Sequence, residues 1–266
     1  MENTARRKAR FPYFSLALLL VGLVFFIGGL IFAKNIDMSK FVKLKDVSET
    51  ITDNPEHLTI DVSYVDLVVT RSEDEEIHIT GTNVDESLKI REANGVLSIS
   101  DKSYSGMNGM SISIARSFKK IPQGKLTVEL PDRLFGQLEI DAGVGDVTIE
   151  NLYCESLDID AGVGDLVIRG IRCEGRINAD AGVGDARIED IECDVLDLDA
   201  GVGDVNINGS IKASVDIDAG VGDITISLTE PEDSYSFTGE YKRYGGKGGY
   251  KITIDSGVGD VSIRFI

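Results

Sequence analysis

The pattern of apolar and polar residues divides the chain into two unlike parts. Residues 11–33 read FPYFSLALLLVGLVFFIGGLIFA and include no charged side chain. Beyond position 57, short runs alternate apolar with polar residues, which is the period of a β-strand with one buried face. No sustained 3.6-residue apolar period interrupts these runs. The sequence therefore predicts an all-β domain behind one long apolar segment.

A six-residue motif recurs through the C-terminal half. It reads DAGVGD, or DSGVGD in the last copy, and the copies begin at Asp141, Asp160, Asp180, Asp199, Asp218 and Asp255. The spacings are 19, 20, 19, 19 and 37 residues, and the last is close to two units. Such a period without helices is typical of solenoids. We therefore predict a single-stranded β-solenoid of stacked 19-residue coils, preceded by one transmembrane helix.

The apolar positions of a unit change parity across its glycines. Positions 157, 159, 161 and 163 share one parity, whereas Leu166 and Ile168 share the other. The chain is therefore expected to turn a corner there and keep its apolar side inward. Glycine suits this corner because it accepts positive φ and lets stacked backbones approach closely. The segment 61–69 aligns with the repeat, and Asn94-Gly95 predicts a hairpin turn within residues 88–100.

The N-terminal segment predicts a membrane anchor. Its 23 apolar residues, at about 1.5 Å each, can cross a hydrocarbon core of about 30 Å. Four basic residues in positions 1–10 predict a cytoplasmic N-terminus and an extracellular C-terminal domain. A cleaved signal peptide is the alternative, although the apolar run is long for one. The predicted parts are a cytoplasmic tail (1–10), a single-pass transmembrane helix (11–33), a juxtamembrane linker (34–56) and an extracellular β-domain (57–266).

Net charge limits the partners of the β-domain. Beyond residue 10, the remaining 23 basic and 44 acidic residues give a net charge of −21. Such a surface repels nucleic-acid phosphates and anionic headgroups, so we expect no nucleic-acid partner and no peripheral membrane docking of the domain. Cations and basic partners remain open.

Two aspartates per coil would form two ladders if the coils stack about 4.8 Å apart. One interpretation is that the carboxylates accept hydrogen bonds from backbone N–H groups of the corners. The alternative is Ca²⁺, which prefers oxygen ligands, and it is the one cofactor the sequence leaves open. The Ca²⁺ candidates are Asp141, Asp146, Asp160, Asp165, Asp180, Asp185, Asp199, Asp204, Asp218 and Asp223.

The sequence predicts no catalytic residue. Catalytic acids occupy differently tuned environments, whereas these aspartates recur with the same neighbours. His57 and His78 are isolated in the sequence, and no nucleophile, phosphate-binding or zinc-ligand motif is present. A polysaccharide-active enzyme that uses a carboxylate pair is the remaining enzymatic alternative.

Three cysteines follow the repeat. Cys154, Cys173 and Cys193 lie 19 and 20 residues apart, so we expect them to stack on adjacent coils. Free, buried thiols are the favoured interpretation, because cysteine is among the most buried residue types. A disulfide between neighbouring coils is the alternative.

The segment 235–251 breaks the repeat with tyrosines and cations. One interpretation is a binding surface for an anionic wall glycan or an envelope protein. The other is a hairpin that pads the degenerate coil. The last coil ends on a strand at Ile266, which predicts self-association through that coil. The candidate partner-binding residues are Tyr241, Lys242, Arg243, Tyr244, Lys247 and Tyr250.

A family resemblance rests on LTVELP at 126–131 followed by units such as LDIDAGVGDLVI at 157–168. These motifs resemble the bacterial toastrack family, also known as candidate adhesins of unknown function, with members in the Lia cell-envelope-stress operon. The resemblance covers roughly residues 58–266 and implies an extracytoplasmic β-solenoid, often encoded with envelope-stress sensors. It carries over no catalytic residue. The predicted function is a membrane-anchored binding or scaffold protein of the envelope-stress response, with a Ca²⁺-dependent adhesin as the alternative.

Overall fold

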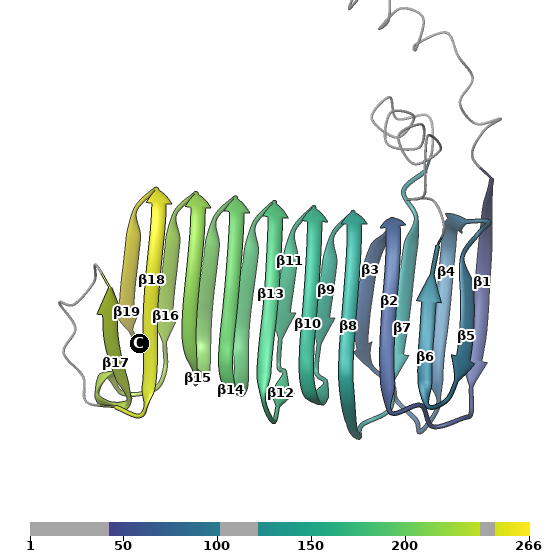
Figure 1. Cartoon of the computed structure of the whole chain (residues 1–266), viewed down its shortest axis with the longest axis horizontal. Coiled ribbons are helices and arrows are strands. Elements are labelled where there is room, and N and C mark those ends of the chain that lie inside the picture. The colour runs from purple at the N-terminus through teal and green to yellow at the C-terminus, as the bar shows by residue number, and fades with distance from the viewer. Residues whose placement is uncertain (1–42, 102–121, 240–247) are drawn as a thin grey trace, which may run out of the picture.

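The computed structural model describes residues 43–101, 122–239 and 248–266 (Figure 1). These residues form strands and one short 3-10 helix, which confirms the predicted all-β class. The elements are β1 (Leu44–Ile51), β2 (His57–Tyr64), β3 (Asp66–Arg71), β4 (Ile77–Asp85), β5 (Lys89–Ala93), β6 (Val96–Ser100), β7 (Lys125–Leu130), β8 (Leu134–Val144), β9 (Val147–Glu150), β10 (Tyr153–Val163), β11 (Leu166–Arg169), β12 (Arg172–Cys173), β13 (Arg176–Val183), β14 (Ala186–Val202), β15 (Val205–Val221), β16 (Ile224–Leu228), η2 (Glu232–Ser234), β17 (Tyr235–Gly239), β18 (Tyr250–Val258) and β19 (Val261–Phe265).

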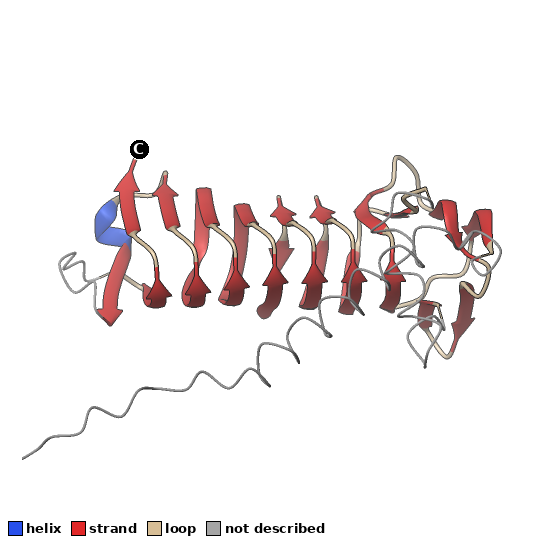
Figure 2. Cartoon of the chain, turned by 90° about the horizontal axis from the view of Figure 1, so that it is seen from above, coloured by secondary structure: helices blue, strands red, loops and turns tan. Residues whose placement is uncertain are grey.

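The repeats stack in parallel register as two rows of strands (Figure 2). The long row contains β8, β10, β13, the ends of β14 and β15, and β18. The short row contains β9, β11, the beginnings of β14 and β15, β16 and β19. Each coil runs along the long row, turns at its glycine corner and returns along the short row.

Aliphatic ladders fill the space between the two rows. Leu157 pairs with Leu138 on one side and Ile177 on the other, and all three are fully buried. Ile168 occupies the equivalent place in the short row. Complete burial of one such side chain contributes about 1.5–3 kcal/mol, so every coil is held by its neighbours.

Two glycines per corner allow the coils to approach one another. A Cβ on Gly162 would lie 2.6 Å from the carbonyl oxygen of Gly143, and one on Gly164 would lie 2.1 Å from that of Gly145. Gly164 also has a φ of 143°. The corner turns the residue between the glycines outward: Val163 is 48% exposed, and its predicted inward position is wrong.

The N-terminal coil lies inside the stack. β2 pairs with β8 on one side and β6 on the other, and β3 lies likewise between β9 and β7. β4 runs antiparallel to both β7 and β1. Residues 44–51, predicted to belong to a linker, therefore form a strand, because the edge of β4 supplies their hydrogen-bond partners. β5 and β6 form the predicted hairpin, with positive φ at Asn94 and Gly95.

The C-terminal coil is also covered by a strand that precedes it in the sequence. β18 lies between β15 and β17 and pairs in parallel with both. The hairpin predicted for residues 235–251 is therefore wrong, since a hairpin would require antiparallel strands. In the short row β19 pairs with β16 and has no second strand partner among the described residues.

Across the three described ranges, no helix is both long enough and apolar enough to span a membrane. The predicted transmembrane helix at residues 11–33 lies outside these ranges.

Candidate functional site

A row of aspartates follows the outer surface of the long row. We call it the outer ladder; its members pair in register from coil to coil, and all seven are exposed. A second acidic row lies two residues earlier on the same strands, at Glu139, Asp158, Asp197 and Asp216. The long row therefore presents a strongly acidic face. The outer ladder consists of Asp61, Asp141, Asp160, Asp180, Asp199, Asp218 and Asp255.

The second aspartate of each motif has a structural role. Asp146 Oδ1 accepts a hydrogen bond from the backbone N–H of Asp165 at 3.0 Å, and Asp165 Oδ1 accepts one from Asp185 at 2.9 Å. The series begins at Asp66 and continues to the last corner. We call it the corner ladder. For these residues, the predicted hydrogen bonds from backbone N–H groups of the corners to aspartate carboxylates are confirmed. The N–H donor belongs to the corner of the following coil.

The negative charges of the outer-ladder carboxylates are not stabilised by comparable hydrogen bonds. Within the described ranges, none of them takes part in a side-chain hydrogen bond or ion pair. Although these side chains are exposed, partial loss of water around the carboxyl group, together with the neighbouring acidic residues, raises the pKa of Asp141, Asp180 and Asp199 above the ordinary value. Other acidic residues are compensated: Arg176 forms an ion pair with Asp197 of the second acidic row, and Arg169 and Arg187 form ion pairs with glutamates in the short row.

A groove runs beside the outer ladder, along the first glycine of each motif. Its larger part has a volume of about 670 Å³ and extends from Asp160 to Asp255. A second part of about 460 Å³ continues to Asp61 and is also lined by Val144 and Val163. Because the floor positions are mainly glycine and alanine, no long side chain fills it. We call this groove the glycine trough.

A line of exposed valines runs beside the trough, and two of them, Val144 and Val163, line its smaller part. We call it the valine ridge: its members pair in register, and each is the residue between the two corner glycines. The alternation of apolar residues predicted that Val163 points into the core. Its position between two glycines was the signal, missed at that stage, that its side chain points outward. The ridge consists of Val144, Val163, Val183, Val202, Val221 and Val258, which are 36–68% exposed.

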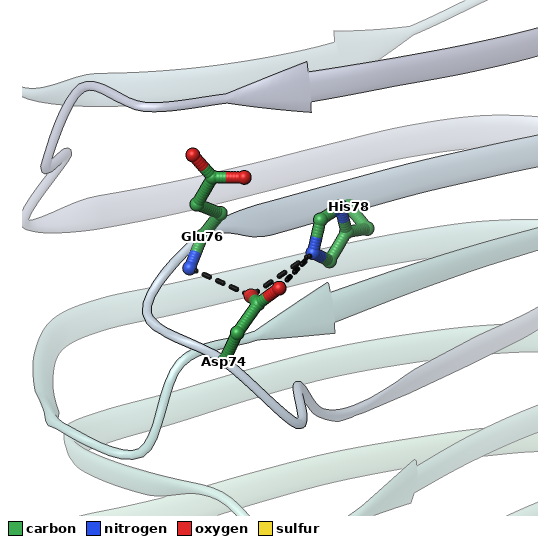
Figure 3. A group of neighbouring side chains, drawn as sticks. All are labelled: Asp74, Glu76 and His78. Atoms are coloured by element: carbon green, nitrogen blue, oxygen red, sulfur yellow. Dashed lines mark hydrogen bonds and ion pairs between the residues drawn. The ribbon is translucent and has the colours of Figure 1, made fainter.

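A separate cluster follows β3 (Figure 3). His78 Nε2 lies 3.0 Å from both carboxylate oxygens of Asp74, which also accepts the backbone N–H of Glu76 at 2.9 Å. Hydrogen bonding to Asp74 raises the pKa of His78, and the Glu76 N–H with the His78 contact lowers that of Asp74. The three side chains could reach one metal ion. The hydrogen bonds that Asp74 forms with the His78 ring and with the backbone N–H of Glu76 already account for its position, so the Asp74 side chain stabilises the turn into β4.

The remaining predicted residues are structural or lie outside the described ranges. His57 Nδ1 accepts the N–H of Gln137 at 2.9 Å. Tyr250 pairs with Tyr235, and their ring centroids are 5.8 Å apart. The other partner-binding candidates, Tyr241, Lys242, Arg243, Tyr244 and Lys247, lie in the undescribed segment 240–247.

The three cysteines are buried and free, as predicted. Cys154 pairs in register with Cys173 on the next coil. Burial raises the pKa of the Cys193 thiol to about 12, so this thiol stays protonated at neutral pH.

Comparison with known proteins gives a family match and several similar folds. A family model described as Toastrack DUF4097 matches residues 55–264. A candidate adhesin from Bacteroides fragilis is 18% identical, with a TM-score of 0.42, over 84% of this chain and 97% of that one. A candidate cell adhesion protein from Clostridium sporogenes is 14% identical, with a TM-score of 0.45, over 84% and 100%. A candidate lipid-binding protein from Parabacteroides distasonis is 14% identical, with a TM-score of 0.38, over 85% and 98%. No curated protein matches the chain significantly.

Proposed function

The chain belongs to the Toastrack DUF4097 family, and on that premise we propose that it is a membrane-anchored, extracytoplasmic binding scaffold of the bacterial cell envelope. In this proposal the two rows of strands are a β-solenoid, and the scaffold serves the envelope-stress response. The role is non-enzymatic: it is to present one long surface to a partner.

The observation that carries the proposal is the repetition of one acidic surface. The outer ladder places the same carboxylate in the same surroundings on successive coils, from Asp61 to Asp255. A catalytic pair requires two differently tuned groups, whereas a binding surface gains from many equal ones. The long acidic face therefore supports multivalent binding of a basic or cationic partner.

The position of β1 supports anchoring through the N-terminal segment. β1 begins at Leu44, opposite Asp85 of β4, at the edge of the fold where the glycine corners lie (Figure 1). Ten residues, 34–43, separate this strand from the apolar run and span at most about 35 Å. The corner edge of the domain would thus be held close to the membrane.

Crosslinking in native membranes tests the scaffold. The full chain would be compared with the triple variant Asp160→Asn, Asp180→Asn and Asp199→Asn, which removes three outer-ladder charges. Loss of a crosslinked partner is expected for this variant. The charge-matched control is Glu155→Gln, Glu192→Gln and Asp194→Asn, whose members are exposed and lie away from the trough. Equal capture by both variants would contradict binding through the acidic face.

Ca²⁺ binding is the second candidate, favoured by the stacked, uncompensated carboxylates of the outer ladder. Thermal melting separates the two functions. The melting temperature of the full chain in neutral detergent would be measured by circular dichroism, once with Ca²⁺ and once with a chelator. A Ca²⁺-dependent adhesin requires a higher melting temperature with Ca²⁺ that the triple variant lacks. The scaffold requires no such shift.

A further inference from the structure

We propose that the glycine trough binds a basic amphipathic helix of a partner protein, with the basic side chains against the outer ladder and the apolar ones against the valine ridge. This inference rests on the proposed binding function and names the chemistry of the partner.

The two sides of the trough differ in a way that selects an amphipathic ligand. Asp160, Asp180 and Asp199 line one wall of the groove. Each ridge valine directly follows a floor glycine in the sequence, so the ridge runs beside the groove, and Val183 and Val202 are each 50% exposed although they pair in register. An apolar line of this length on a soluble surface is typical of an interaction site. A ligand that contacts both the aspartates and the valines needs positive charge on one side and apolar side chains on the other.

The backbone of the floor favours a helix over an extended strand. The floor residues belong to strands that already pair with the coil on each side, as β13 pairs with β10 and β14. These strands have no free row of N–H and C=O groups for an added strand. A helix satisfies its own backbone and would contact the trough through side chains alone.

The length of the trough suits a helix of moderate size. Seven outer-ladder positions, about 4.8 Å apart, extend over about 29 Å. A helix that long has about 19 residues, at about 1.5 Å per residue. Its turns, about 5.4 Å apart, differ from the ladder spacing by only about 0.6 Å, so a few neighbouring turns can meet neighbouring coils.

Charge argues against two other occupants. Anionic lipid headgroups and a second copy of the trough would both place negative charge against the outer ladder, which repels them. Charged pairs of the short row, such as Arg169 with Glu150, are already neutralised. A basic partner is the one that the uncompensated carboxylates attract.

The test uses the full chain in neutral detergent and a fluorescein-labelled 19-residue helical peptide with leucines on one face and lysines beside them. Fluorescence anisotropy would measure its dissociation constant, with a scrambled peptide of the same composition as the control. The ridge variant combines Val163→Thr, Val183→Thr and Val202→Thr, which keep the β-branched shape. The outer-ladder triple variant and its charge-matched control complete the set.

We expect the ridge and ladder variants each to weaken binding at least about tenfold. The ladder variant should also lose part of the salt dependence. Unchanged melting temperatures would show that the variants fold. Three results would overturn the proposal. The parent chain could bind the scrambled peptide as tightly as the helical one, or the ridge variant could bind the helical peptide as tightly as the parent chain. The parent chain could also bind anionic vesicles more tightly than the helical peptide. If membrane crosslinking still captures a partner while the ridge variant has no effect, the scaffold stands and the helix proposal falls.

Discussion

The second glycine of each corner determines how closely two coils can approach. At Gly203, φ is 145°, and a Cβ would lie 1.9 Å from the carbonyl oxygen of Gly184. Backbone cannot move aside as a flexible side chain can. The corner therefore accepts only glycine at this position for two separate reasons, conformation and space.

Substitutions separate these two reasons. We expect Gly203→Ala to destabilise the fold by about 4 kcal/mol or more, because it combines left-handed strain with a backbone clash. Gly95→Ala should cost only about 1–2 kcal/mol, since Gly95 has positive φ but open space around it. Thermal unfolding of the full chain in neutral detergent measures both.

Gly249→Ala is the control, because nothing lies within 4 Å of its Cβ position and its φ is not in the left-handed region. It should change stability little. Similar losses for Gly203→Ala and Gly95→Ala would show that stacking distance does not limit the corner.

At the residue scale, the sequence predicted the glycine corners but not the direction of the valines between them. The recurrence of the motif and the wide range of φ that glycine accepts were sufficient to predict the corners. Parity counting failed for Val163 because a corner interrupts the alternation on which it depends. The outer and corner ladders were both visible as aspartates, but only coordinates show that Asp146 reaches the next coil while Asp160 does not.

At the element scale, the corner ladder joins each turn to the next one. Asp185 Oδ1 accepts the N–H of Asp204 at 2.9 Å. Asp185→Asn keeps an acceptor oxygen and removes a charge, so we expect a change within about 0.5 kcal/mol. Asp185→Ala removes the acceptor and should cost about 1 kcal/mol.

Thermal melts of the two Asp185 variants, performed alongside the parent chain, provide the comparison. If the asparagine variant loses as much stability as the alanine variant, then the charge rather than the acceptor is required at the corner.

The sequence predicted those strands whose alternating apolar residues are buried. It did not predict strands or pairings that depend only on hydrogen bonding to a neighbouring strand. The hairpin at Asn94-Gly95 has a local turn signal. β1 has a weak alternation, because it completes the edge of β4 with little burial. The parallel pairing of β17 with β18 depends on the direction of the neighbouring coil, which no local pattern encodes.

At the scale of the whole molecule, the acidic face makes stability depend on pH. The pKa values of Asp141, Asp180 and Asp199 are raised in the fold, so the folded chain holds these protons more tightly than the unfolded chain. Their stabilising effect is present below the ordinary pKa and lost as pH rises through the folded values. We therefore expect the melting temperature to increase as pH falls through the raised pKa values of these groups towards the ordinary aspartate value of 3.8.

Added salt should also raise the melting temperature at pH 7, because it screens the repulsion between neighbouring carboxylates of the outer ladder. Circular dichroism melts across pH and salt would measure both effects. The variant Asp141→Asn, Asp180→Asn and Asp199→Asn should flatten the pH dependence, and an unchanged slope would assign the effect to other carboxylates.

The displaced order of the terminal coils has a consequence for biosynthesis. β2 and β3 leave the ribosome before β6 and β7, which later close one side of them and leave the other side as a template for β8 and β9. Growth can then proceed in one direction, each new coil docking on a finished one. β17 emerges before its neighbour β18, which must enter between it and β15. A nascent chain stalled before β18 would therefore leave β15 and β17 without the strand that joins them.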